Sequence, residues 1–175
     1  MLNFKTSVDA FHCLTEPKNV ELFTEFGIMS SVELNAREEI LFENYSKVID
    51  IEAKTMVDIA NRKIIPAIEK YVAELTATAK DKLEVFGASA PVALERRLIG
   101  ELSLLADTAY ATAEKLKNAA VAADGESDCK ASAFAYKDKV IPLMASLRAA
   151  VDKAETVVPT DIWPLPCYGD MTLKQ

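Results

Sequence analysis

One stretch of the sequence, residues 34–85, restricts the possible folds more than any other. It contains no glycine and a single proline, Pro66. Apolar residues recur along it every three or four positions, which is the repeat of an amphipathic helix. They are Ile49, Ala53, Met56, Ala60, Ile64, Ala67, Tyr71 and Leu75. Two helices separated by a loop have no reason to keep a common phase, so the pattern predicts one long helix in which Pro66 is a kink and not a break.

Two later stretches show the same repeat. The first carries Leu94, Leu98, Leu102, Leu105, Ala109, Ala113, Leu116 and Ala120, and the second carries Val140, Met144, Leu147, Val151, Ala154 and Val158. Long amphipathic helices joined by short turns bury their apolar faces by folding back on one another. The chain is therefore expected to form an antiparallel bundle of three long helices.

Helix boundaries at the N-terminal side are marked by capping residues and by Gly or Pro. Thr15 is expected to cap a short helix that has Pro17 in its first turn and stops at Gly27. Ser30 and Glu33 have the spacing of a capping box, in which each side chain satisfies a free amide of the first turn. The first long helix should therefore begin next to Ser30.

The other boundaries follow from two turn signals. In "FGASAP", Gly87 is expected to end the first long helix, with Ser89 as the next N-cap and Pro91 in the first turn. In "ADGESD", Gly125 marks a turn, and the last helix should start near Ser127.

A second proline segment resembles the first. "KIIPAIEKYVAEL" contains Pro66, "KVIPLMASLRAAV" contains Pro142, and the prolines are 76 positions apart. A duplicated hairpin is one explanation. The other is that β-branched residues before proline are a common way to fill a kink, and one matching pair is weak support for a repeat. In both cases Pro66 and Pro142 are predicted to be structural kinks in long helices.

Composition agrees with an all-α fold. Half the residues are apolar and only five are glycine, and a chain of 175 residues is long enough for one domain with a hydrophobic core. A single domain is expected over residues 1–175, with a lead-in and short helix (1–29), the long-helix bundle (30–158) and an extended, proline-rich tail (159–175).

Charge and cysteine content exclude some classes of partner. The formal net charge of −7 would repel nucleic acid and anionic membrane surfaces. No apolar run approaches the roughly 20 residues that span a bilayer. The three cysteines, Cys13, Cys129 and Cys167, are odd in number and far apart, which favours a reducing compartment. We therefore expect a cytoplasmic protein with no nucleic-acid or membrane partner.

Catalytic and metal-binding motifs are not found. His12 is the single histidine. No second histidine is present for a Cys–His–Asn, Ser–His–Asp or multi-histidine metal site, or for a di-iron site with two Glu-x-x-His motifs. Packing is the expected role of His12. Four acidic residues of the first long helix are expected to lie on the surface and form ion pairs there: Glu43, Asp50, Glu52 and Asp58. Arg96 and Arg97 are expected to be an ordinary surface pair. We assign no catalytic, cofactor-binding or metal-binding residue.

The tail "PTDIWPLPCYGDMTLKQ" does not fit a helix, because three prolines interrupt it. Trp163 and Tyr168 are its expected anchors and our candidate interface residues. They either cover the open end of the bundle or dock onto another domain or subunit, since a tryptophan left in water exposes a large apolar area.

Two segments resemble the C-terminal region of type III glutamine synthetases. They are "REEILFENYSKVIDIEAKTMVDIANRKIIPAI", residues 37–68, and "IWPLPCYGD", residues 162–170. The lead-in "SVDAFHCLTEPKNVELFTEFGIMSSVEL" is similar to the segment that precedes this region in the family, whereas residues 76–136 match only as an alanine-rich helix.

The resemblance implies an enzyme that joins ammonia to glutamate with ATP and Mg²⁺ or Mn²⁺, in a double-ringed homo-oligomer. In that family the catalytic carboxylates and the ATP-binding groups precede this region, and no motif here matches them. The expected role of this chain is therefore structural, in assembly with the catalytic domain of the same polypeptide or with neighbouring subunits. The alternative is a free-standing helical module, related to that region, that binds another protein.

Overall fold

The computed structural model describes residues 4–166, and every regular element within that range is helical. The prediction of an all-α fold is thereby confirmed for the described part of the chain. None of these helices is both long and apolar enough to cross a membrane.

The first long helix runs without a loop through α3 (Ser31–Ile59), the π-helical turn η2 (Ala60–Ile64) and α4 (Ile65–Phe86). The predicted capping box begins it. The Ser30 amide donates to Glu33 Oε2 at 2.7 Å, and the Glu33 amide donates to Ser30 Oγ at 3.3 Å. The predicted continuity past Pro66 is also seen, because Pro66 is the second residue of α4.

The π-helical turn explains how proline fits inside this helix. Proline has no amide hydrogen, and in an α-helix its ring crowds the carbonyl four residues earlier. In η2 the backbone widens, and the Ile65 amide donates to the carbonyl of Ala60, five residues earlier. One added residue in the turn also changes the phase of the helix. Ile68, which lies outside the predicted stripe, is fully buried beside Ala67, and it lies on the same helix face as Ile64, four residues earlier.

Pro142 lies in the same setting. The last helical run consists of α6 (Cys129–Ala135), the π-helical turn η4 (Tyr136–Val140) and α7 (Ile141–Glu155), and the Ile141 amide donates to the Tyr136 carbonyl. A proline creates the same local requirement wherever it occurs, so the shared geometry does not by itself argue for duplication. The bend at each proline remains a prediction.

Between these runs lies α5 (Ala93–Asp124), which α4 reaches through the 3₁₀ turn η3 (Gly87–Ser89). Gly87 takes φ +58°, the left-handed conformation that ends many helices. Ser89 was wrongly predicted to cap α5. Its hydroxyl donates to the Phe86 carbonyl at 2.8 Å, and α5 begins two residues after Pro91. The last run is capped by Asp128, which accepts from the Ala131 amide at 2.9 Å.

The N-terminal segment contains α1 (Ser7–Phe11), the 3₁₀ turn η1 (His12–Thr15) and α2 (Pro17–Glu25). The predicted short helix is α2, but Thr15 does not cap it, because Glu16 occupies the N-cap position. Sequence reasoning missed α1. Its signal is Thr6 with Asp9 three residues on, since Asp9 Oδ2 accepts from the Thr6 amide at 3.2 Å.

The chain forms two compact units. Unit 1 contains residues 1–54 and 117–142, and unit 2 contains residues 55–116 and 143–175. The long helices contribute residues to both units, so the single domain and the three-helix bundle remain predictions.

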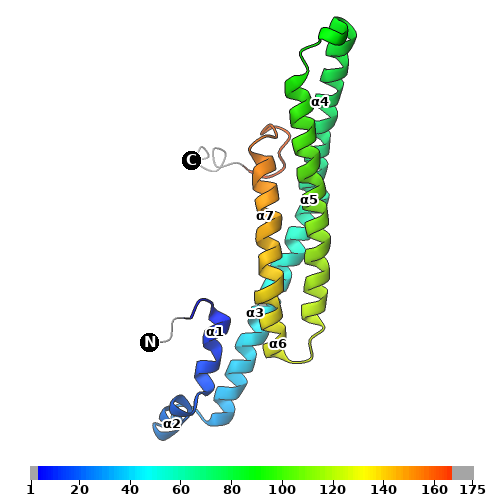
Figure 1. Cartoon of the computed structure of the whole chain (residues 1–175). Helices are drawn as coiled ribbons and strands as arrows, with labels where there is room; N and C mark the ends of the chain where they lie inside the picture. Colours follow the sequence, from blue (N-terminus) through cyan, green and yellow to red (C-terminus); the bar gives the residue numbers. More distant parts are fainter. Residues whose placement is uncertain (1–3, 167–175) are drawn as a thin grey trace. The chain divides into compact units, whose positions relative to one another are not determined.

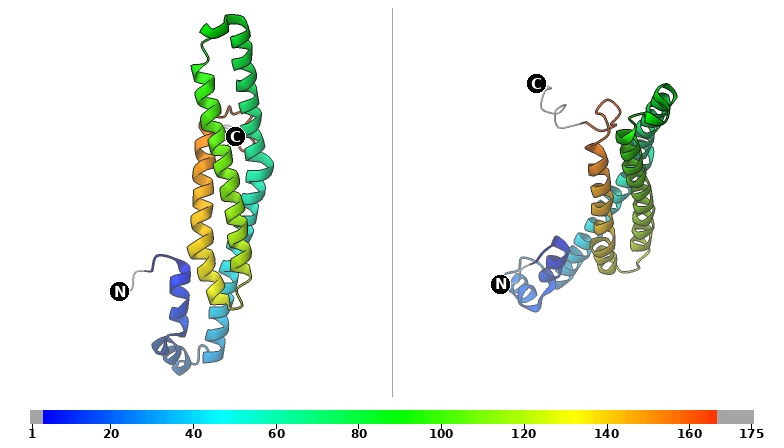
Figure 2. Two further views of the ribbon diagram at one scale, coloured as in Figure 1. Left: turned by 45° about the vertical axis from the view of Figure 1, so that its right-hand side comes forward. Right: turned by 45° about the horizontal axis from the view of Figure 1, so that its top comes forward.

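Unit 2 has a core formed by α4, α5, α7 and the start of the tail, whose described parts lie side by side in Figures 1 and 2. The buried members of this core are Ile64, Ile68, Leu102, Ala106, Ala154, Val158 and Trp163.

Unit 1 has a smaller core between α1, α3 and α6, with Val8, Phe42 and Ala133 at its centre. The Phe11 and Phe42 rings meet edge to face at a centroid distance of 5.3 Å. Lys137 Nζ lies 2.6 Å from Asp9 Oδ1 and connects η4 to α1.

Candidate functional site

Trp163 lies inside the core of unit 2. Its side chain is 5% exposed and packs with Ile68 and Val158. The turn that carries it is held by the Trp163 amide, which donates to the Pro159 carbonyl at 2.9 Å. Of the two alternatives for Trp163, the structure therefore shows it covering a core of its own chain. Tyr168, the other candidate anchor, lies outside the described residues, so its role stays a prediction.

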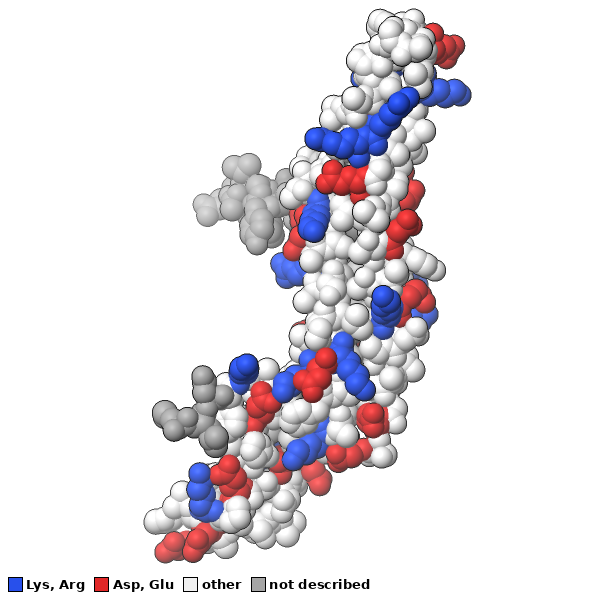
Figure 3. All heavy atoms as spheres, viewed as in Figure 1, with Lys and Arg blue, Asp and Glu red and all other residues white. Residues whose placement is uncertain are grey.

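A different surface exposes apolar groups, at the turn where α4 passes into α5. Leu83, Val85, Phe86 and Leu94 form what we call the apolar hairpin end, and between 39% and 74% of each residue is exposed. Figure 3 shows uncharged atoms at the very tip of the hairpin, at the top of the view, with acidic and basic side chains at its edge and just below it. Leu94 was predicted to belong to the buried stripe of α5 and is instead exposed, because it lies where the hairpin ends and has no third helix over it. Exposed apolar patches of this kind mark contact surfaces.

An ion pair with one buried partner connects the two helices of this hairpin, and 36% of its Lys82 side chain is exposed. Lys82 Nζ of α4 lies 2.5 Å from Glu95 Oε1 of α5, and Glu95 is 5% exposed. The hydrogen bond from Lys82 holds the pKa of the Glu95 carboxyl below its ordinary value of 4.5. Because the Glu95 carboxylate is buried, losing this pair should cost more than losing an exposed surface pair.

This pair gives a pH-dependent prediction. Because the pKa of Glu95 is lower in the folded state, its ion pair contributes stability above pH 4.5 that is lost as the pH falls through the folded pKa. We expect Glu95→Gln to lower Tm at neutral pH, and the difference from wild type to shrink below pH 4.5. The measurement is Tm by differential scanning calorimetry from about pH 3 to about pH 7, because carboxyl groups titrate within that range.

Glu43→Gln is the matched control, because Glu43 pairs with Lys47 on the surface and 53% of its side chain is exposed. Its Tm should change little at any pH. A Tm difference for Glu95→Gln that stays constant over the whole pH range would show that Glu95 acts by packing and not by charge.

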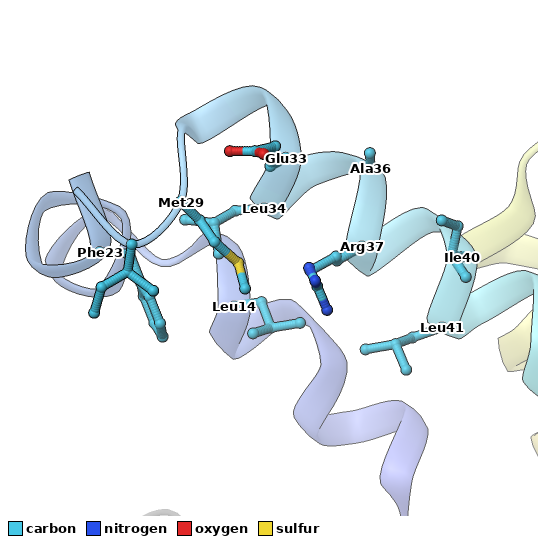
Figure 4. A pocket seen from close by; sticks show the side chains of 10 residues that line it. Leu14, Phe23, Met29, Glu33, Leu34, Ala36, Arg37, Ile40 and Leu41 are labelled. Carbon is cyan, nitrogen blue, oxygen red and sulfur yellow. The ribbon is translucent and has the colours of Figure 1, made fainter.

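Unit 1 contains an apolar pocket of about 700 Å³ between η1, α2 and the start of α3. Figure 4 shows Phe23, Met29 and Leu34 towards the left of the pocket, and Leu14 and Leu41 lower in the view. Arg37 is the one positively charged group among its lining residues. The pocket is open and is lined by few polar groups that could orient a reacting molecule, so it has the character of a packing surface and not of a catalytic cleft.

Tyr136 makes a buried polar contact in unit 1. Its hydroxyl donates to Asp50 Oδ1 at 3.1 Å and lies 3.3 Å from the Ala120 carbonyl. Burial and the neighbouring carboxylate raise the pKa of Tyr136 far above its ordinary value of 10. Asp50 was predicted to be a surface ion-pair residue. It does pair with Lys54, but only 16% of its side chain is exposed, because Tyr136 covers it.

The other predicted surface charges lie as expected. Glu43 and Asp58 pair with basic residues four positions later, whereas Glu52, Arg96 and Arg97 are exposed. The lining of the apolar pocket contains no Ser, Thr, Cys or His side chain. Sequence reasoning also missed the apolar hairpin end, although "LEVFGASAPVAL" places apolar residues on both sides of a turn and could have indicated it.

Comparison with known proteins relates this chain to glutamine synthetases. Residues 1–82 match the family described as glutamine synthetase C-terminal domain. A glutamine synthetase of Butyrivibrio fibrisolvens is 28% identical over 169 residues, which are 97% of this chain and 24% of its own length. The type-3 glutamine synthetase of Dictyostelium discoideum is 26% identical over 98% of this chain and 24% of its own length.

A third relative, a glutamine synthetase of Bacteroides fragilis, is 27% identical over 82% of this chain and 20% of its own length. The chain thus spans less than a quarter of each relative while nearly all of it is matched in two of them. This helical chain therefore resembles the glutamine synthetase C-terminal domain, by the family model over residues 1–82 and by relatives matched over nearly its whole length.

Proposed function

We propose that this chain is the assembly domain of a glutamate–ammonia ligase and has no chemistry of its own. The relatives are named glutamine synthetases and are about four times longer, so the ATP, divalent metal and glutamate sites would lie in the part of the enzyme that this chain does not match. The match over nearly the whole chain favours this function over a free-standing binding module.

The observation that carries the assembly role is the apolar hairpin end. Phe86 and Val85 are 58% and 74% exposed, in a hairpin whose two helices are connected by the Lys82–Glu95 ion pair. A stable support with apolar groups at its end is suited to docking on the catalytic part of the enzyme or on a neighbouring subunit, because association buries the apolar area. We infer a homo-oligomer as the working form.

We also place the protein in the cytoplasm. Cys13 and Cys129 are free thiols, which is the usual state of cysteine in a reducing compartment.

The test uses the longest reading frame that contains these 175 residues. We expect that protein to sediment as a large oligomer and to form glutamine from glutamate, ammonia and ATP. Charged groups at the centre of an interface prevent association, so Val85→Glu with Phe86→Glu should release smaller species. Sedimentation velocity measures the assembly, and a glutamine assay measures its consequence.

Leu104→Glu with Val121→Glu is the matched control. These residues are 66% and 64% exposed and lie on α5, away from the hairpin end. The control pair should leave the oligomer intact. If both pairs dissociate the protein equally, or if neither does, the hairpin end is not the assembly surface. If the protein forms no glutamine at all, the ligase proposal itself fails.

A further inference from the structure

Three metal-ligand side chains meet in unit 1 where η1 joins α2. His12 and Cys13 are the first residues of η1, and Glu16 is the N-cap residue of α2. One possible ligand atom from each, an imidazole nitrogen, the Cys13 sulfur and a carboxylate oxygen, lie within 4.8 Å of one another. All three residues are half-buried. Neither the fold nor the proposed assembly role requires this grouping.

The backbone around the three residues is held by side chains that are not themselves ligands. Asn19 Nδ2 donates to the Cys13 carbonyl at 2.5 Å. The Thr15 hydroxyl lies 2.8 Å from Glu38 Oε2 and 3.2 Å from the His12 carbonyl. The His12 ring meets Phe4 edge to face at 5.9 Å. These contacts with α2, α3 and Phe4 hold η1 in place, so a metal ion would meet a largely organised set of ligands.

The donor set selects a class of ion. Imidazole nitrogen, thiolate sulfur and carboxylate oxygen are the three ligand types of zinc sites, whereas Mg²⁺ and Ca²⁺ take oxygen ligands. Thiolate and carboxylate together carry two negative charges, which match a divalent cation. In a tetrahedral site with zinc bond lengths of about 2.0–2.3 Å, ligand atoms are roughly 3.5 Å apart. Side-chain rotations that move the ligand atoms by about 1 Å would therefore bring the three groups to the spacing of a zinc site.

Two features oppose binding. Burial raises the pKa of the Cys13 thiol and so disfavours the thiolate that binds a metal ion. Lys18 Nζ lies 3.0 Å from Glu16 Oε2 and would repel a cation. However, 74% of the Lys18 side chain is exposed, so its ammonium can turn into solvent at little cost.

We propose that His12, Cys13 and Glu16 bind a borderline-soft divalent transition-metal ion of the zinc class. Binding forms a metal–sulfur bond and releases the thiol proton to solvent, with no change of oxidation state. A fourth position remains for water. The bound ion would link η1 to α2 and stabilise unit 1. Our expectation of no metal ligands came from counting histidines, and it overlooked mixed sets in which a single histidine is enough.

The experiment uses Co²⁺ as the spectroscopic probe, in the full 175-residue chain with Cys129→Ser and Cys167→Ser. Cys13 is then the single thiol of the chain. Any thiolate-to-cobalt charge-transfer absorption must come from Cys13. We expect this absorption to saturate at one equivalent of Co²⁺ and to be displaced by Zn²⁺.

The substitutions His12→Gln and Glu16→Gln separate a built site from a lone reactive thiol. Loss of an outer-shell partner already weakens metal binding by about 10–100-fold, so loss of a ligand should cost at least about 100-fold. Glu38→Gln should cost less, and Glu21→Gln on α2 should change nothing. Far-UV circular dichroism confirms that each variant is folded. The proposal is overturned if Cys13 gives no charge-transfer absorption, or if His12→Gln and Glu16→Gln leave the affinity unchanged.

Discussion

Trp163→Ala is expected to lower the free energy of unfolding by about 3–5 kcal/mol, the usual cost of removing a buried large aromatic side chain. Trp163 is the largest buried side chain in the core of unit 2, a cluster that also contains Ile68 of α4 and Val158 of the segment after α7. Its loss leaves a cavity where helices distant in sequence meet. Urea unfolding followed by far-UV circular dichroism measures the change, since this substitution removes the single tryptophan that fluorescence would report.

Trp163→Phe separates packing from hydrogen bonding. Trp163 Nε1 is buried and has no hydrogen-bond partner among the described residues, so phenylalanine gives up no bond in this structure and keeps most of the apolar area. It should cost clearly less than alanine. A loss of under about 1 kcal/mol for Trp163→Ala would be smaller than core cavities produce, and would mean that Trp163 does not help to hold unit 2 together.

Tyr136→Phe is the second large expected effect. It keeps the ring, which is 1% exposed, and removes the hydroxyl that donates to Asp50. A hydrogen bond to a charged group contributes about 1.5–3 kcal/mol, and the buried acceptors lose a partner when it is removed. We expect a decrease of that size in the free energy of unfolding, measured by urea denaturation.

Tyr110→Phe is the control, because Tyr110 is 57% exposed and the same atom is removed. It should leave stability unchanged within about 0.5 kcal/mol. The double variant Tyr136→Phe with Asp50→Asn gives the coupling between the two groups. If the two single effects simply add, the Tyr136–Asp50 hydrogen bond contributes nothing to stability, and the effect of Tyr136→Phe has another cause.

Local features of the sequence were enough to predict the long helices and several of their ends. The stripe from Ile49 to Leu75 is buried or half-buried along its whole length, and the Ser30–Glu33 capping box forms as its spacing indicates. Such features depend on residues three or four positions apart, so they can be recognised without knowing what packs against them. The family resemblance was likewise carried by local motifs, and the comparisons confirm it.

The candidate site was predicted less well, because its residues depend on neighbours far along the chain. Leu94 has the same place in the helical repeat as Leu98, yet it is exposed, since α7 does not extend to the end of the α4–α5 hairpin. The exposed hairpin end was therefore missed, and Trp163 was left with two alternatives that only the packing could separate.

By itself, the sequence determined that the chain is helical, where its long helices run, and which family it resembles, because periodicity, caps and motifs act over a few residues. Only the tertiary structure decided which apolar groups are covered, and how the prolines fit. Glu95 became a buried partner of Lys82, Asp50 was covered by Tyr136, and each proline followed a π-helical turn. Burial is set by contacts between distant segments, and the pattern within any one helix does not contain them.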